Sequence, residues 1–164
     1  MNQEREQEVV RLGAVLDFMQ LLWAVDHSLQ TASKRMKSTL RVTGPQRLVV
    51  RIVGRLPGIS AGRLASILRV HPSTLTGVLR RLEAGQALSR RGDPTDGRRA
   101  LFSLTAKGRE IDACQSGTIE AAVRRALVRS SPRDITAASR VLGTLADELA
   151  REVPVRRKKG STAA

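Results

Sequence analysis

The sequence predicts a mainly α-helical fold in which a helix-turn-helix unit is followed by a β-hairpin. Apolar residues recur every three or four positions over most of the 164 residues, which is the period of an α-helix. Three short helical segments with tight joints follow one another between residues 44 and 84, as in a helix-turn-helix. Two short alternating segments then flank the turn sequence GDPTDG.

A long first helix is expected from about Glu8 to Met36. It carries two apolar seams at steps of three and four, which are Val15, Phe18, Leu22, Val25 and Leu29, and Val9, Leu12, Leu16, Met19 and Trp23. Two seams are more than the core of one small domain requires. We therefore expect its own fold to cover one side of this helix and a second subunit to cover the other.

Turn and capping residues delimit the three helices of the helix-turn-helix. Thr43-Gly44-Pro45 begins the first, because the missing N–H of Pro45 costs little in a first turn, and Pro57-Gly58 ends it. Ser60 caps the second helix, and His71-Pro72 starts the third, which covers 72–84. The residues expected to point inward are Leu48, Val49, Ile52, Val53 and Leu56, then Leu64, Ala65 and Leu68, then Leu75, Val78, Leu79 and Leu82.

A hairpin and two closing helices complete the expected fold. The strands are 87–91 and 100–104, with Ala100, Phe102 and Leu104 pointing inward at period two. Thr105 caps a helix that runs to about Arg129, and Ser131-Pro132 caps the last helix. The apolar seam of the last helix also needs a partner, and it consists of Ile135, Ala138, Leu142, Leu145 and Leu149. The basic tail after Pro154 is expected to be disordered.

The positive charge is concentrated on one segment of the chain. The formal net charge is +14, and residues 41–104 hold twelve basic against three acidic side chains. Such a concentration implies a polyanionic partner, and next to helix-turn-helix spacing it indicates nucleic acid. With Phe18, Trp23 and Phe102 as the only aromatic residues, recognition of single strands by base stacking is disfavoured, so double-stranded DNA is the expected partner.

Other classes of protein find little support in the sequence. The two histidines are far apart, and no catalytic or metal-binding motif is present, so we expect no enzyme activity, no metal and no cofactor. The longest apolar run is too short to span a bilayer, and the N-terminus lacks the layout of a signal peptide. A single cysteine fits a reducing compartment. We therefore expect a cytoplasmic protein without a membrane partner.

Candidate DNA contacts lie on the 72–84 helix and on the hairpin. The outward side chains of the helix are Ser73, Thr74, Thr76, Arg80 and Arg81, and we add Ser60 at the start of the preceding helix. The hairpin contributes Arg90, Arg91, Arg98 and Arg99 around its tip, where Asp96 can hold Arg98 in a fixed pose. A solvated helix face and an ordinary turn are the alternative interpretations of these residues.

The chain resembles the MarR family of bacterial transcription regulators in the segments HPSTLTGVLRRLEAGQAL and DPTDGRRALFSLTAKG. The resemblance implies a winged helix-turn-helix DNA-binding unit with a helical dimerisation region formed by the N- and C-terminal helices. Arg98 then matches the arginine at the wing tip and Asp96 the acid before it. Pro72, Ser73, Thr74 and Thr76 match the start of the recognition helix. Many relatives have arginine where this chain has Gly77.

The resemblance also implies the domain organisation and the mode of action. The N-terminal dimerisation helix would cover 1–40, the DNA-binding unit 41–104, the C-terminal dimerisation helices 105–153 and the tail 154–164. A homodimer would repress a nearby gene from a palindromic operator until a small anionic or lipophilic effector releases it. Loose candidates for the effector site are Trp23, Asp26, His27 and Arg47.

Two other functions remain open at this point. High charge, the basic tail and Gly77 are also compatible with a sequence-tolerant architectural DNA-binding protein. Cys114, expected within the fifth helix, allows a redox-sensing regulator, although a buried cysteine usually behaves as a small apolar side chain.

Overall fold

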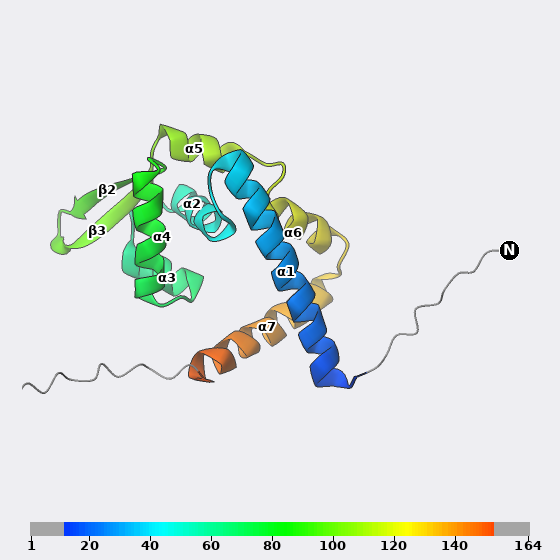
Figure 1. The fold of residues 1–164 in the computed structure, drawn as a ribbon. Helices are drawn as coiled ribbons and strands as arrows, with labels where there is room; N and C mark the ends of the chain where they lie inside the picture. Colours follow the sequence, from blue (N-terminus) through cyan, green and yellow to red (C-terminus); the bar gives the residue numbers. More distant parts are fainter. Residues whose placement is uncertain (1–11, 153–164) are drawn as a thin grey trace, which may run out of the picture. The chain divides into compact units, whose positions relative to one another are not determined.

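Seven helices and three short strands make up the computed structural model over residues 12–152, the part of the chain that it describes (Figure 1). In chain order they are α1 (Ala14–Leu40), α2 (Gly44–Arg55), β1 (Ile59–Ser60), α3 (Ala61–Leu68), α4 (Pro72–Ala84), β2 (Leu88–Asp93), β3 (Asp96–Leu104), α5 (Ala106–Ala113), α6 (Ile119–Val128) and α7 (Pro132–Glu152). The chain divides after Ala121 into two compact units. The expected helical residues 8–11 and the expected basic tail lie outside the described residues.

The first unit is built around one apolar core beneath α2, α3, α4 and the sheet. The buried residues are Val42, Val49, Val50, Val53, Ile59, Leu64, Ala65, Leu75, Leu79, Leu82, Ala87, Leu88, Phe102 and Ile111. The inward faces predicted for α3, α4 and β3 are confirmed. The stripe predicted for α2 is partly wrong, because Leu48 and Leu56 are exposed and Val50 is fully buried instead.

Side-chain caps explain why the helices begin where they do. At α2, the Thr43 hydroxyl accepts from the Gln46 backbone N–H, and the Gln46 side chain accepts from the Thr43 N–H at 2.9 Å. Ser60 caps α3 and His71 caps α4, which begins with Pro72 as predicted. These caps satisfy N–H groups that have no partner inside a helix. The predicted starts of α2 and α4 are confirmed to within a residue.

The wing is a three-stranded antiparallel sheet in the order β1-β3-β2. The predicted strands 87–91 and 100–104 are too short, because β2 and β3 extend toward the tip until only two residues separate them. The register shifts between Gly92 and Asp93, where Gly92 faces Ala100 but Asp93 faces Asp96. β1 was not predicted, since two residues are too few to show a period.

The helix predicted from Thr105 to Arg129 is wrong, because the chain breaks between α5 and α6. Cys114 is in an extended conformation just after α5, and Gly117 has a φ of 66°, which favours glycine. Thr118 then accepts a hydrogen bond from the Ala121 N–H at 3.2 Å and begins α6. Cys114 is therefore in a joint and not inside a helix.

Close backbone approaches fix the contacts of α5 and of α2. A Cβ atom at Gly108 would overlap the carbonyl oxygen of Ala87, so the start of α5 lies directly on the backbone that leads into β2. Thr105 supports this contact, because its N–H donates to the same carbonyl at 3.2 Å. At Gly54 in α2, a Cβ atom would lie 2.8 Å from a carboxylate oxygen of Asp112. Glycine at these positions allows α5 to pack closely.

The apolar seams of α1 and of the last helix are exposed. α1 runs four residues beyond the predicted end at Met36, which is also its only buried residue within the described span. Val15 is 73% exposed and Trp23 is 77% exposed. α7, in the second unit, has no buried residue, and Leu142 and Leu149 are exposed. Among the described helices none is long and apolar enough to cross a membrane.

Candidate nucleic-acid interface

α4 presents a polar and basic face because its apolar residues all turn to the core. Leu75, Leu79 and Leu82 are buried, whereas Ser73, Thr74, Thr76, Arg80 and Arg81 are exposed as predicted. In the first turn, the Ser73 hydroxyl lies 2.7 Å from Nδ1 of His71, and the Thr76 hydroxyl donates to the Pro72 carbonyl at 2.9 Å. These contacts fix two of the three hydroxyls on this face.

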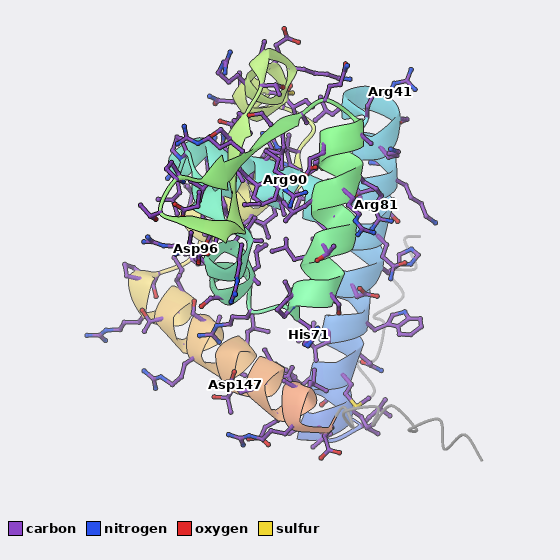
Figure 2. All side chains as sticks on the ribbon, turned by 90° about the vertical axis from the view of Figure 1, so that its left-hand side faces the viewer. Arg41, His71, Arg81, Arg90, Asp96 and Asp147 are labelled. Carbon is purple, nitrogen blue, oxygen red and sulfur yellow. The ribbon has the colours of Figure 1, made fainter. Side chains whose placement is uncertain are left out.

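α4 carries two arginines, Arg80 and Arg81, close to Gly77 in the sequence. A Cβ atom at Gly77 would lie 3.5 Å from a terminal nitrogen of Arg81, so the Arg81 guanidinium lies over the glycine. Arg80 is exposed and makes no hydrogen bond or ion pair within residues 12–152. Figure 2 shows Arg81 along α4 and Arg90 on the neighbouring strand. Arg80 and Arg81 are therefore both exposed cations on α4, and Arg81 lies over Gly77.

The four wing arginines do not share one surface. Arg90 pairs across the sheet with Phe102 and Arg91 pairs with Leu101, so the two side chains leave opposite faces of the sheet. Only the face of Phe102 covers the core. Both arginines and Arg98 are exposed, and their guanidinium groups form no hydrogen bond or ion pair with another described residue.

Asp96 shapes the tip through the backbone. Its carboxylate accepts a hydrogen bond from the backbone N–H of Arg98 at 3.0 Å. The sequence-based expectation placed this carboxylate on the Arg98 side chain, but in the structure the guanidinium of Arg98 is left exposed. The turn is therefore fixed without neutralising the cation at its tip.

Arg99, in contrast, is held by two neighbours. Its Nη2 donates to the Ser60 hydroxyl at 3.3 Å, and its Nε lies 4.0 Å from Oδ2 of Asp93. Asp93 also accepts from the Thr95 hydroxyl at 2.7 Å and from the Thr95 N–H at 2.9 Å. These hydrogen bonds, together with the Arg99 charge, hold the pKa of Asp93 below its ordinary value, so this carboxylate is ionised at neutral pH.

Ser60 is not an exposed contact, although the sequence analysis included it among the DNA-binding residues. It is 8% exposed, and its hydroxyl accepts from the Arg63 N–H at 3.4 Å as well as from Arg99. Asp93 was not among the predicted site residues. The turn sequence Asp-Pro-Thr predicts a local hydrogen bond for Asp93. It does not predict the contact of Asp93 with Arg99 on the opposite strand of the hairpin.

The predicted effector residues do not converge. Arg47 is 2% exposed and donates from its guanidinium to the backbone carbonyls of Ile111 and Cys114, the latter at 2.6 Å. Its Nε also pairs with Glu120 at 2.5 Å. Trp23, Asp26 and His27 are exposed on α1, and Asp26 accepts from Gln30 at 2.7 Å. Arg47 therefore joins α2 to the α5–α6 joint, and its donors are already in use.

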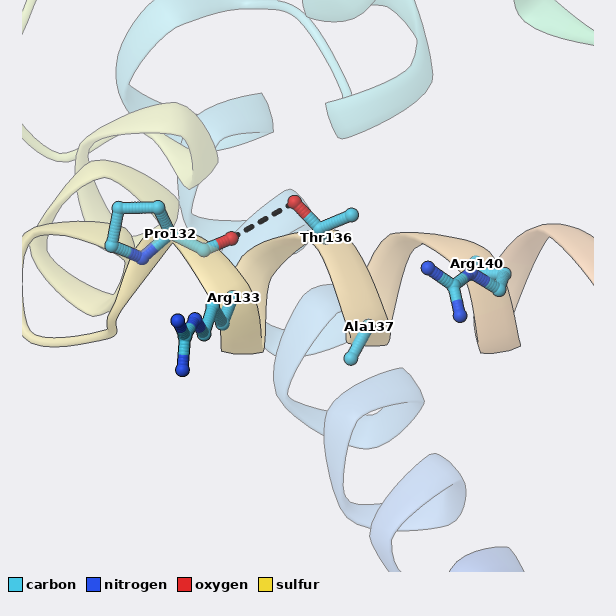
Figure 3. A pocket seen from close by; sticks show the side chains of 5 residues that line it. All are labelled: Pro132, Arg133, Thr136, Ala137 and Arg140. Carbon is cyan, nitrogen blue, oxygen red and sulfur yellow. Dashed lines mark hydrogen bonds between the residues drawn. The ribbon is translucent and has the colours of Figure 1, made fainter.

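One shallow hollow follows α7 alone and is lined by Pro132, Arg133, Thr136, Ala137 and Arg140 (Figure 3). Because it is formed by one face of a single helix, it does not enclose a ligand. Within the described residues, no three His, Cys, Asp or Glu side chains gather as metal ligands would.

Residues 42–100, which include α2, α3, α4 and most of the wing, match the model of the MarR family. The HTH-type transcriptional repressor Rv2887 of Mycobacterium tuberculosis is 32% identical over 109 residues, which cover 66% of this chain and 78% of that protein. The chain belongs to the MarR family. Relatives of this kind are transcription regulators, so the chain is a regulator and not an enzyme.

Solved structures show the same MarR-family fold. The Staphylococcus aureus MepR–DNA complex matches with a TM-score of 0.66 at 18% identity, over 80% of this chain and 97% of that one. PcaV from Streptomyces coelicolor, in complex with its natural ligand, matches with a TM-score of 0.67 at 21% identity, over 84% and 97%. A mainly α-helical winged helix-turn-helix fold, as predicted from the sequence, is confirmed.

Cys114 occupies the α5–α6 joint of this MarR-family chain. It is half-buried, and its thiol lies 3.6 Å from the carbonyl oxygen of Ser116. Its own carbonyl accepts from Arg47. Redox sensing through Cys114 stays an untested alternative.

Proposed function

We propose that the protein is a homodimeric transcription repressor that binds a palindromic operator in double-stranded DNA and is released by a small-molecule effector. One observation carries the DNA-binding part of this proposal. Arg80 on α4 and Arg98 on the wing are both exposed cations without a protein partner in the described chain. They extend from a helix and from a hairpin that pack on one core. Binding to DNA would place the protein in the cytoplasm with the chromosome.

Each part of the interface suits a different groove. α4 has the length and the polar face of a recognition helix in the major groove, where arginine reads guanine. The wing tip would carry Arg98 to the flanking minor groove. A bound relative, MepR with DNA, and a repressor relative, Rv2887, support this arrangement. The other predicted contacts are Ser73, Thr74, Thr76 and Arg81 on α4, and Arg90 and Arg91, which leave opposite faces of the wing.

The exposed apolar seams support the dimer. α1 exposes Val15, Leu16, Met19 and Trp23, and α7 exposes Leu142 and Leu149. Apolar stripes of this length are usually covered by a partner. Two copies of this chain would give a two-fold axis that matches a palindromic operator. We retain the division into dimerisation segments 1–40 and 105–153 around a DNA-binding unit at 41–104.

An effector would act on the distance between the two DNA-binding units. It must bind the released arrangement better than the DNA-bound one, because a ligand without this preference shifts nothing. The complex of PcaV with its natural ligand supports an effector of this kind. Trp23, Asp26 and His27 on α1 remain the candidates for contacts with a small anionic or lipophilic effector. Arg47 leaves the candidate set because it is buried and paired.

The first experiment is a fluorescence-anisotropy titration of the full chain. The probe is the DNA upstream of its own gene, compared with a scrambled duplex of equal length at two salt concentrations. We expect a preference for the native duplex that survives the higher salt, because base contacts are less salt-dependent than phosphate contacts. Equal and steeply salt-dependent binding to both duplexes would contradict an operator at this position.

Two arginine variants test the roles within the interface. Arg98→Ala is expected to weaken operator binding by at least about tenfold, because the homodimer loses one charge-assisted contact from each wing, while the dimer survives. Arg80→Ala is expected to reduce the preference for operator over scrambled DNA more than it reduces binding to the scrambled duplex. Unchanged affinity of Arg98→Ala would remove the wing from the interface. A uniform loss with Arg80→Ala would make Arg80 a phosphate contact.

A second candidate function is favoured by Gly77 and by the charge. A glycine in the middle of α4 has no side chain for a base contact, and the net charge of +14 supports binding to any duplex. These features are typical of a sequence-tolerant architectural protein. The ratio of operator to scrambled affinity separates the two functions, because an architectural protein gives a ratio near one.

A further inference from the structure

We propose that Arg99 is a positioning residue that fixes the wing, through Asp93 and Ser60, and is not itself a DNA contact. The inference rests on the proposed function and deepens it, because it assigns DNA contact to Arg98 and positioning of the wing to Arg99. The sequence analysis placed Arg98 and Arg99 together as DNA contacts, since neighbouring arginines at a hairpin tip look equivalent.

Geometry separates the two arginines. The Arg99 side chain bridges three parts of the unit: β3 on which it lies, Asp93 at the end of β2, and Ser60 at the N-terminus of α3. The Asp93 side chain is only 12% exposed, and Ser60 is 8% exposed. The guanidinium of Arg98 has no comparable contact among the described residues.

The register of the hairpin explains why such a bridge is needed. Regular pairing of β2 with β3 ends at Gly92 and Ala100, and the next pair is Asp93 with Asp96. Residues 97–99 are therefore an excess on β3 without ladder partners on β2. Pairing with β1 ends at Leu101. Side-chain contacts of Arg99 thus replace the missing backbone ladder at the base of the tip.

The charges at the wing tip also favour a positioning role for Arg99. Asp93 is ionised at neutral pH, and an unpaired carboxylate at a DNA-facing tip would repel phosphate. Arg99 neutralises it locally, so the pair contributes little net charge to DNA. Arg98 then remains as the cation that the tip presents.

The sign of one substitution distinguishes positioning from contact. If Arg99 contacted DNA, Asp93→Asn would free it and remove a repulsive charge, so affinity would rise. If Arg99 positions the wing, Asp93→Asn loosens the tip and affinity falls although the protein becomes more positive. Glu110→Gln on α5 is the matched control, since it makes the same change of charge at an exposed residue away from the wing.

Operator binding and hydrogen exchange are measured together on the full chain. Asp93→Asn and Arg99→Ala are each expected to weaken operator binding by about fivefold, and the double variant no further, as for residues acting as one unit. In the free protein, both variants are expected to speed amide exchange in residues 96–101, whereas Arg98→Ala and Glu110→Gln leave it unchanged.

Opposite results overturn the proposal. These are tighter operator binding by Asp93→Asn, additive losses in the double variant, or exchange in residues 96–101 that is unchanged in both single variants. If the wild-type chain binds no operator, the proposed function fails, and the exchange measurement alone then decides the role of Arg99. The two failures are therefore distinguishable.

Discussion

Gly108 and Gly77 are both helical glycines, but their surroundings differ sharply. A methyl group at Gly108 would overlap the Ala87 carbonyl, while one at Gly77 would meet only the flexible end of Arg81 at 3.5 Å. A glycine within a helix also lowers the stability of the folded protein, because glycine loses more conformational freedom on folding than any other residue. Substitution by alanine should therefore have opposite effects at the two positions.

Gly108→Ala is expected to lower the free energy of unfolding by about 3 kcal/mol, because the start of α5 must move away from the backbone before β2. Gly77→Ala, the control, is expected to raise it by about 1 kcal/mol. Urea denaturation of the two variants at one protein concentration measures both changes. A Gly108→Ala variant as stable as the wild type would contradict the close approach.

At this scale, the sequence predicts which side chains are inward on α4 but not which arginines are paired. Leu75, Leu79 and Leu82 follow from helical period alone. Arg99 and Ser60 lie 39 residues apart, and their contact depends on how β1 pairs with β3. No local pattern records that pairing, so both residues were assigned to the DNA surface.

Among the elements, the joint between α5 and α6 is the one that depends most on a distant side chain. At the end of α5, the carbonyls of Ile111 and Cys114 both accept hydrogen bonds from Arg47 of α2, and the Ile111 carbonyl also accepts from the Cys114 N–H. Glu120 of α6 balances the buried charge. Arg51 pairs with Asp112 at 2.7 Å but is 30% exposed.

Arg47→Met is expected to lower the free energy of unfolding by about 3 kcal/mol, because it removes a buried guanidinium that donates to the carbonyls of Ile111 and Cys114 and pairs with Glu120. Arg51→Met is the matched control and is expected to cost at most about 1 kcal/mol, as for partly exposed pairs. Both variants lose one positive charge on α2. Chemical denaturation compares them, and equal losses would contradict a special role for Arg47.

The break in the α5–α6 region also marks a limit of prediction. Residues 105–129 show apolar spacing that suits one long helix, and Gly117 alone is a weak signal for a break. At the end of α5, Arg47 of α2 donates a hydrogen bond to the carbonyl of Cys114, a tertiary contact that no local pattern records. β1 is missed for a related reason, since its two residues become a strand only by pairing with Phe102 and Leu101.

For the whole molecule, the exposed seam of α1 predicts concentration-dependent behaviour. Trp23 is the single tryptophan of the chain and is 77% exposed in one copy. If a second copy covers α1, the fluorescence emission of Trp23 should shift to shorter wavelength as the protein concentration rises. Quenching of this emission by iodide should decrease over the same range. Val15→Glu, on the same helix, is expected to weaken the dimer by at least about tenfold, because it buries an unpaired charge.

Analytical ultracentrifugation over the same concentrations provides the independent measurement. Emission that stays at the exposed wavelength in a species sedimenting as a dimer would place the interface away from Trp23. The seams of α1 and α7 were predicted from sequence period. The expectation that the chain's own fold covers one side of α1 is not met in the described residues, because Val15 and Val25 of one seam and Leu16 and Trp23 of the other are all exposed.

The Arg47 contacts have a consequence for the order of events during synthesis. Arg47 and Glu120 are 73 positions apart, so α2 is made long before the residues that complete its packing. At about 5–20 residues per second, Glu120 follows Arg47 by roughly 4–15 seconds. During this interval the growing chain adds residues with a strong excess of arginine, and α2 has neither Ile111 nor Glu120 to pack against. The winged unit thus reaches its final stability only after translation has passed the segment beyond it.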